Sequence, residues 1–211
     1  MHSNKATRKI RGAITPQRSH GKARVAAVLG AGAAVIAEKG YDAATMAEIA
    51  ARAKAPIGSL YRFFPNKEIL AGALVQRYAV LINEAFDAID NQVNDDASLE
   101  IIADGILDFM INLHGESKAM LGLLEARSEW SARRVEFRDL VLKRIAKTLL
   151  LCAPALPRGD AKDVAVILLH NMKTMKAMQF VQNVATSSGA ANELRYMNRL
   201  YLVNKLRKKA R

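Results

Sequence analysis

Apolar residues recur at helical spacing along most of the chain, and no segment sustains the apolar–polar alternation of a half-buried strand. Between about residues 22 and 39, for example, Val25, Leu29, Gly32 and Ile36 fall on one face of a helix. Further helices are expected at about residues 45–53, 56–64, 67–90, 98–113, 117–127, 131–152, 160–184 and 191–208. The sequence therefore predicts an all-α protein, and its 51% apolar residues can fill a core.

The second and third expected helices are short, and their ends are well specified. Thr45 and Glu48 form a capping box, in which the threonine hydroxyl takes one free amide and the glutamate reaches back to another. Gly40 supplies the left-handed residue that stops the helix before them. Pro56 suits a first helical turn, because the N–H that it lacks would have no partner there. The sequence thus predicts a short helix, a tight turn and a second short helix.

Positive charge is concentrated in the N-terminal third. Through Lys67 the chain has 12 basic and 3 acidic residues, a net charge of +9, which leaves +3 of the total +12 for the rest. Residues 1–20 are polar and basic and bury little apolar surface, so we expect a flexible arm. Such an arm can enter a minor groove, or it can be a solvated tail. The charge indicates a polyanionic partner, such as nucleic acid or acidic lipid.

The short helix, turn and short helix, placed between a basic arm and a long helix, have the layout of a DNA-binding helix-turn-helix. Two segments within residues 22–74 resemble the N-terminal domain of the tetracycline-repressor (TetR) family. They are Gly40-Tyr41-Asp42-Ala43-Ala44-Thr45-Met46-Ala47-Glu48-Ile49-Ala50 and Gly58-Ser59-Leu60-Tyr61-Arg62-Phe63-Phe64-Pro65-Asn66-Lys67-Glu68. The resemblance implies a basic arm at 1–20, a three-helix DNA-binding domain at 21–67, and an all-α effector-binding and dimerisation domain at 68–211, entered by a long helix.

The candidate DNA contacts surround the second helix of the motif. Gly58 lets the backbone approach DNA closely, and Ser59 can bond a base edge or a phosphate. Arg62 can bond guanine or phosphate, and Tyr61 typically reaches phosphate in the family. We expect Leu60 and Phe64 to point into the core instead. The full set of expected DNA-binding residues is Thr45, Lys54, Ile57, Gly58, Ser59, Tyr61, Arg62 and Lys67.

Two of these residues have competing interpretations, and a third departs from the family pattern. A cation such as Lys67 at a helix N-terminus opposes the macrodipole, which indicates a phosphate contact; a solvated lysine beside Glu68 is the alternative. Thr45 can touch phosphate or only cap its helix. Lys54 stands where the family usually has glycine, so it is expected to accept a left-handed conformation and to recover its charge at DNA. Gly32 also departs from the family, which usually has alanine there.

The later helices are consistent with a dimeric, ligand-responsive regulator. Two apolar stripes are candidates for a four-helix interface across a two-fold axis, with an ordinary intrachain core as the alternative. They are Val164, Leu168, Met172 and Met175, and Leu194, Met197 and Tyr201. The expected residues of a pocket for an apolar or aromatic effector are Phe109, His114, Trp130, Phe137, Met175 and Met178. The family resemblance implies a repressor that a small effector releases from a palindromic operator.

Other classes of protein have less support. The sequence has no phosphate-binding glycine loop, zinc-spaced Cys and His set or nucleophile elbow, so neither an enzyme nor a metal or other cofactor is expected. The single cysteine, Cys152, requires no oxidising compartment, and a cytoplasmic protein without a membrane partner fits. Residues 25–37 resemble the apolar part of a secretory signal, but cleavage there would remove the packing partner of the motif. A non-specific DNA-coating protein and an activator of the same fold remain alternatives.

Overall fold

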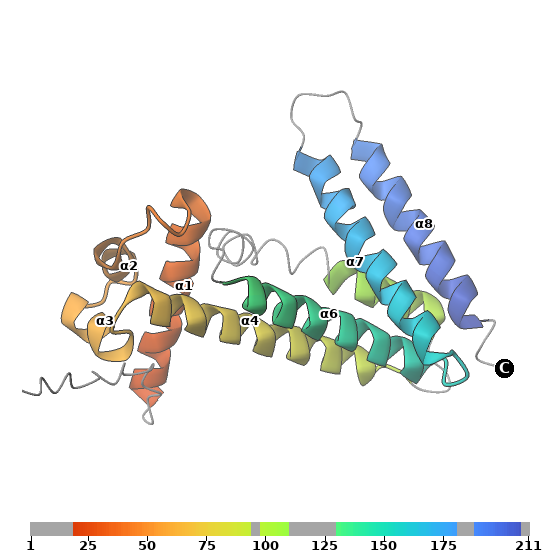
Figure 1. Ribbon diagram of the computed structural model, residues 1–211, viewed down its shortest axis with the longest axis horizontal. Coiled ribbons are helices and arrows are strands. Elements are labelled where there is room, and N and C mark those ends of the chain that lie inside the picture. Colours follow the sequence, from red (N-terminus) through yellow and green to blue (C-terminus); the bar gives the residue numbers. More distant parts are fainter. Residues whose placement is uncertain (1–18, 94–97, 110–129, 181–187, 208–211) are drawn as a thin grey trace, which may run out of the picture. The chain divides into compact units, whose positions relative to one another are not determined.

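The computed structural model describes residues 19–93, 98–109, 130–180 and 188–207 (Figure 1). Throughout these ranges the regular structure is helical, which confirms the predicted all-α class. The helices are α1 (Ser19–Lys39), α2 (Met46–Arg52), α3 (Ile57–Phe63), α4 (Lys67–Asp90), α6 (Ser131–Cys152), α7 (Arg158–Phe180) and α8 (Ser188–Arg207), and residues 99–109 are also helical. The basic arm through residue 18 and the helix expected at 117–127 lie outside the described residues.

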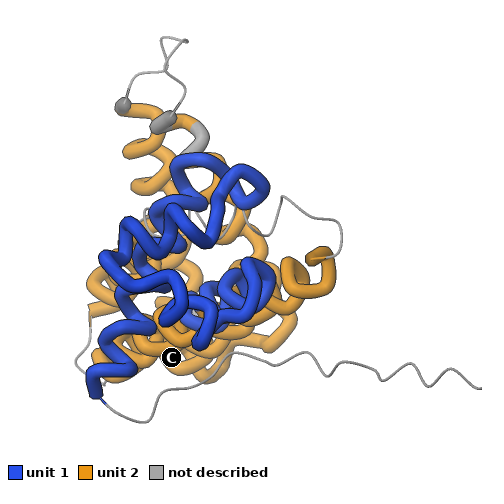
Figure 2. The backbone as a smooth tube through the Cα atoms, turned by 90° about the vertical axis from the view of Figure 1, so that its left-hand side faces the viewer, with its two compact units in different colours: residues 1–78, 118–128 blue, residues 79–117, 129–211 orange. Residues whose placement is uncertain are grey.

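The chain divides into two compact units (Figure 2). One comprises residues 1–78 and 118–128, and the other comprises residues 79–117 and 129–211. Helix α4 passes from the first unit into the second, with the division after Tyr78. By length and composition alone α4 could also cross a membrane, a property that it shares with the core helices of soluble proteins.

The first unit is built on close packing of α1 against α2 and the start of α4. Ile36, Ile49 and Leu70 are buried there, together with Leu60 of α3. A Cβ atom added to Gly32 would lie 3.0 Å from Leu70 Cδ2, closer than such atoms normally pack. The glycine that departs from the family pattern therefore allows α1 to approach α4 more closely than alanine would.

The second unit has a continuous apolar core formed by the end of α4, residues 99–109, α6, α7 and α8. From α4 this core takes Ile82, Phe86 and Ile89, whereas Leu81 and Ala85 are only half-buried. Ile82, Phe86 and Ile89 recur at helical spacing, so they share one face of α4, and this face packs against the core.

The α7 stripe predicted for a dimer interface lies in the core of its own chain. Val164, Leu168, Met172 and Met175 are all buried among the apolar residues of the second unit. Of the α8 stripe, Leu194 packs against this core, whereas Met197 and Tyr201 are exposed. The α7 prediction was therefore wrong, because helical periodicity marks a buried face without saying which chain covers it.

Polar contacts tie the helices of the second unit together. Arg144 of α6 bonds Asp87 at 2.6 Å and Asp90 at 3.2 Å, and both carboxylates come from the last turns of α4. Thr148, which is fully buried, donates to Asp90 as well. On the other side, Arg199 of α8 pairs with Asp104 at 3.0 Å. These pairs fix the register of α6 on α4 and of α8 on residues 99–109.

Candidate nucleic-acid interface

The capping box at the start of α2 forms as predicted. The Glu48 amide donates to Thr45 Oγ1 at 3.2 Å, and the Thr45 amide donates to Glu48 Oε2 at 3.1 Å. The threonine hydroxyl also donates to the same carboxylate at 2.9 Å. Because capping occupies both its donor and one acceptor site, the presence of Thr45 is explained without DNA, although its exposed position leaves a phosphate contact as a proposal.

Two ion pairs attach α2 to the end of α1. Lys39 pairs with Glu48, and Arg52 pairs with Glu38 at 2.7 Å. The hydrogen bond from Lys39, followed by those from Thr45, lowers the pKa of Glu48 to about 2. The hydrogen bond from Arg52 also lowers the pKa of Glu38. Both acidic groups are therefore charged at neutral pH and neutralised by partners within the domain.

The turn between α2 and α3 has the left-handed conformation that the family resemblance implied for Lys54. Lys54 has φ of 49°, and among the described non-glycine residues it alone has positive φ. Its amide donates to the Ala51 carbonyl at 3.1 Å, and the next amide donates to Ala50 at 3.0 Å, which closes the end of α2. A left-handed conformation costs a residue with a Cβ atom roughly 1–2 kcal/mol. Lys54 is exposed in this strained position.

Helix α3 presents one exposed face. Ile57 and Tyr61 are 45% and 47% exposed, and Gly58 and Arg62 lie beside them on the same face. On the opposite side Leu60 is buried, as is Phe64 just after the helix, which confirms the inward orientation predicted for both. Solvent-exposed isoleucine and tyrosine one helical turn apart form a surface that can lie against a partner.

Gly58 has no structural explanation within the described part of the chain. A Cβ atom added there would meet no other atom within 4 Å, and its φ is not positive. Glycine in a helix destabilises it by about 0.5–1 kcal/mol relative to alanine. A residue that weakens α3 without helping the packing is consistent with close approach of another molecule to this face.

Arg24 of α1 reaches Ser59 beside the exposed face of α3, a contact that the sequence did not predict. Its Nη1 atom lies 3.5 Å from Ser59 Oγ, a long hydrogen bond across 35 residues. Among the described residues Arg24 and Arg62 have no carboxylate partner, and the Arg62 guanidinium lies 4.7 Å from the centroid of the Phe63 ring. No sequence signal placed Arg24 here, because this contact depends on how α1 crosses α3.

Lys67 has a role different from the predicted phosphate contact. Its ammonium donates to the carbonyl oxygens of Tyr41 at 2.8 Å, Asp42 at 3.0 Å and Ala44 at 2.9 Å. An ammonium has three donors, and all three are used here. The cation at the start of α4 is therefore offset by carbonyl groups of the α1–α2 connection. This geometry argues against the phosphate interpretation.

The expected effector residues lie in or beside the core of the second unit. Met175 and Trp130 are buried, and Phe109 packs edge-on against Phe86 with ring centroids 4.7 Å apart. Phe137 is partly buried against the same core, Met178 is half-buried, and His114 lies outside the described residues. A cavity of about 650 Å³ lies elsewhere, between α6 and α7, and none of these six residues lines it. Their role in effector binding stays a prediction.

One segment of the chain matches a known protein family. The family model "Bacterial regulatory proteins, tetR family" matches residues 28–74, which include α2, α3 and the turn between them. No curated protein sequence matches the chain.

Solved structures similar to this chain are transcriptional regulators. One, of the TerR/AcrR family from Aquifex aeolicus VF5, has a TM-score of 0.64 at 19% identity, covering 85% of this chain and 97% of its own. A TetR-like regulator from Rhodococcus sp. RHA1 has a TM-score of 0.59 at 19% identity, covering 85% and 95%. The fatty acid degradation regulator FadR from Bacillus halodurans has a TM-score of 0.62 at 16% identity, covering 87% and 96%.

At these identities the solved structures establish the shared fold, and the matched segment identifies the DNA-binding domain. Regulators of this family bind DNA and are not enzymes. Residues 28–74 therefore match the tetR family of bacterial regulatory proteins, and the chain has the fold of the solved regulators.

Proposed function

We propose that this regulator binds a palindromic operator as a cytoplasmic homodimer, represses transcription, and is released by a small effector. The observation that carries the DNA-binding part is the exposed face of α3, where Ile57, Tyr61 and Arg62 surround a glycine that the fold does not need. This face would enter the major groove, with Gly58 allowing close approach and Ser59 positioned at the base edges.

The proposed DNA contacts also include Arg24, which holds the Ser59 hydroxyl from α1. We infer that Thr45 and Lys54, at the start and just past the end of α2, contact the flanking phosphates, because both are exposed. In this proposal residues 21–67 bind DNA, and residues 68–211 dimerise and bind the effector. Lys67 supports the DNA-binding domain through its carbonyl contacts.

The proposed dimer interface uses the exposed face of α8 and the neighbouring face of α7. Tyr196, Met197 and Leu200 are 53%, 62% and 49% exposed, and they lie within two turns of one helical face. Ile167 of α7 is exposed as well, and Asn171 of α7 bonds Asn198 of α8 at 2.8 Å, which holds the two helices together. Large apolar side chains clustered on one face mark an interaction surface. Association of two chains about a two-fold axis would bury this surface on both of them.

Replacing Met197 and Leu200 with glutamate tests the interface. Because both side chains are exposed, the variant should fold, yet two like charges from each copy would oppose association. Sedimentation should show a dimer for the wild-type protein and a monomer for this variant. A variant that stays dimeric would place the interface elsewhere.

Selection of bound sequences from random DNA tests the central proposal. A dimer that reads both half-sites should enrich a palindrome whose half-site centres are about 34 Å apart, one helical turn. Affinity for that site should exceed affinity for random DNA by about 10³-fold or more at physiological salt. Equal affinity for both would instead identify a protein that coats DNA without sequence preference.

The proposed effector must bind two states of the dimer with different affinities. It weakens DNA binding only to the extent that it binds the DNA-incompetent arrangement more tightly than the DNA-competent one. Phe109, His114, Trp130, Phe137, Met175 and Met178 are the residues we propose from the sequence for an apolar or aromatic effector. Ligands should be screened against the selected operator, and an effector would lower operator affinity at saturation.

A further inference from the structure

We propose that the groove between α6 and α7 binds a soluble amphiphile that carries an anionic head and an unbranched apolar tail. The groove has a volume of about 650 Å³, within the range of roughly 300–1,000 Å³ typical of small-molecule sites. Its walls come from residues 139–151 of α6 and residues 158–166 of α7. Along α6 this stretch is about 18 Å long, since each helical residue rises 1.5 Å.

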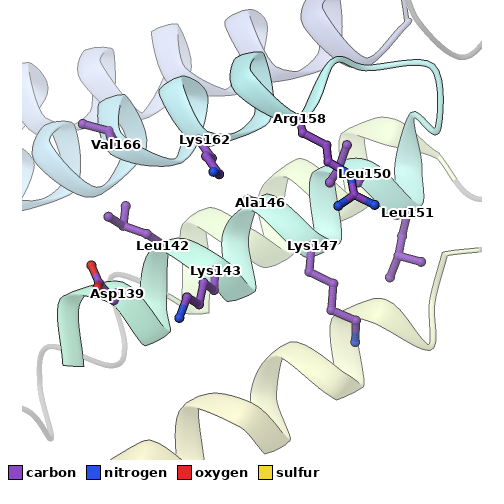
Figure 3. Close-up of a pocket in the computed structure, with 10 residues that line it drawn as sticks. All are labelled: Asp139, Leu142, Lys143, Ala146, Lys147, Leu150, Leu151, Arg158, Lys162 and Val166. Carbon is purple, nitrogen blue, oxygen red and sulfur yellow. The ribbon is translucent and has the colours of Figure 1, made fainter. Parts of the chain in front are cut away.

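The floor and walls of the groove are apolar. Figure 3 shows Leu142 and Ala146 of α6 facing the α7 side, and the α7 wall adds Val166. At the other end the figure places Leu150 beside Arg158 at the start of α7, whereas Leu151, which also lines the groove and is 44% exposed, points away from α7. An alkyl chain lying along this surface would bury apolar area on both sides.

Cations surround the apolar surface. Arg158 and Lys162 point from α7 toward α6 in Figure 3, and α6 contributes Lys143 and Lys147, of which Lys147 points away from α7 and pairs with Asp90. Against these four cations the lining has one acidic residue, Asp139, which Figure 3 places at the end away from Arg158. The charge pattern therefore favours an anionic head near the start of α7 and an apolar tail running toward Leu142 and Val166.

The α7 cations are not used within the described part of the chain. Lys147 bonds Asp90 at 2.8 Å, but Arg158 and Lys162 pair with no carboxylate among the described residues. These two residues lie four apart on one helical face, where like charges destabilise a helix. Arg158 is also in the first turn of α7, where a cation opposes the helix dipole. A bound anion between them would relieve both effects.

The occupant that fits is a small molecule. A groove of this volume can hold one alkyl chain along its length, whereas a membrane surface would need cations on a convex or flat face. Binding of an amphiphile in this groove does not depend on the proposed function. Only its role as an effector rests on that function.

Titration calorimetry of the full chain with decanoate tests the site. One decanoate should bind per chain, and 1-decanol and acetate, which lack the head or the tail, should each bind at least tenfold more weakly. Octanoate, which is shorter by two methylene groups, should bind roughly tenfold more weakly. Higher ionic strength should weaken decanoate binding and leave 1-decanol unaffected.

Substitutions in the exposed lining provide the matched comparison. The double variant R158Q/K162Q should lose at least tenfold in decanoate affinity, and L151S should lose a few-fold. K173Q removes another exposed lysine from α7 outside the groove and should bind as the wild-type protein does. All of these side chains are exposed, so circular dichroism should show intact folding for each variant.

Several outcomes would overturn the site. One is that R158Q/K162Q binds decanoate as tightly as the wild-type protein does. Another is that the wild-type protein binds 1-decanol as tightly as decanoate. A third is that the protein binds only anionic lipid vesicles or an acidic peptide and not decanoate. Operator binding is measured separately. If decanoate binds the groove and leaves operator affinity unchanged, its effector role is excluded while the site stands. If the chain shows no palindrome preference, the proposed function fails whatever the calorimetry gives.

Discussion

The ammonium group of Lys67 donates to the carbonyl oxygen of Tyr41 at 2.8 Å and lies 4.5 Å from the centroid of the same tyrosine ring. Together with the bonds to Asp42 and Ala44, this contact ties the start of α4 to the connection between α1 and α2. One lysine thereby satisfies three carbonyl groups that no helix pairs. The contact fixes the frame on which α2 and α3 are held.

Replacing Lys67 with methionine should destabilise the protein. The methionine keeps much of the apolar stem but leaves three carbonyls without their donor, and an unsatisfied polar group costs about 1–3 kcal/mol when buried. Urea denaturation measures the loss, and Lys22→Met on the exposed start of α1 is the control. The slope of operator affinity against salt should stay unchanged. If Lys67→Met is as stable as the wild-type protein and its salt slope of operator affinity is smaller by about one, Lys67 contacts a phosphate after all.

Replacing Gly58 with alanine should separate stability from DNA binding. Alanine stabilises a helix by about 0.5–1 kcal/mol relative to glycine, and the added methyl group meets nothing in the free protein. We expect a more stable protein that binds its operator more weakly, because the methyl group would occupy space needed by DNA. Denaturation and operator titration measure the two effects.

Gly30→Ala on α1 is the matched control for Gly58. Its added Cβ atom also meets nothing within 4 Å, so it should stabilise α1 and leave operator affinity unchanged. If Gly58→Ala behaves in the same way, the exposed face of α3 does not approach DNA closely.

Replacing Lys54 with glycine should relieve the strain in the turn. The positive φ of 49° is unfavourable for lysine by roughly 1–2 kcal/mol, and glycine adopts it without a Cβ clash. The greater flexibility of glycine in the unfolded chain offsets part of this gain, so we expect a net stabilisation of about 1 kcal/mol.

If Lys54 contacts a phosphate, Lys54→Gly should also reduce the salt slope of operator affinity by about one. Lys54→Gln keeps the strain and removes only the charge, so it should show the slope change without the stabilisation. An unchanged slope in both variants would remove Lys54 from the interface.

The stability of the first unit should depend on pH through Glu48. Its pKa falls from an ordinary value of 4.5 to about 2 in the folded protein, mainly because of the hydrogen bond from Lys39. A lowered pKa stabilises the fold above the unfolded value, and this contribution disappears as the pH falls from 4.5 toward 2. Glu48→Gln should therefore be less stable than wild type at pH 7, with the difference shrinking below pH 4.5.

Urea denaturation of both proteins from pH 7 to pH 3 provides the measurement. Glu193→Gln, at an exposed position of α8 without an ion pair to any described residue, should match the wild-type protein throughout. A constant difference between Glu48→Gln and wild type across this range would show that the Lys39 contact does not persist in solution.

Local sequence determined the elements of the DNA-binding motif. The capping box at Thr45 and Glu48 and the stop at Gly40 follow from hydrogen bonds and backbone sterics within a few residues, whereas the left-handed Lys54 was expected only from the family resemblance. The inward orientation of Leu60 follows from helical periodicity, which also predicted an all-α fold.

Only the tertiary structure decided which partner each face and each charge would meet. Lys67 binds carbonyls 23 to 26 residues away, Arg24 reaches Ser59, and the stripe through Leu168 packs within its own chain. The groove beside Arg158 and Lys162 likewise exists only once α6 and α7 pack together. Periodicity specifies that a helical face is apolar or charged, but the contact energy depends on which helix crosses it, and that is set by long-range packing.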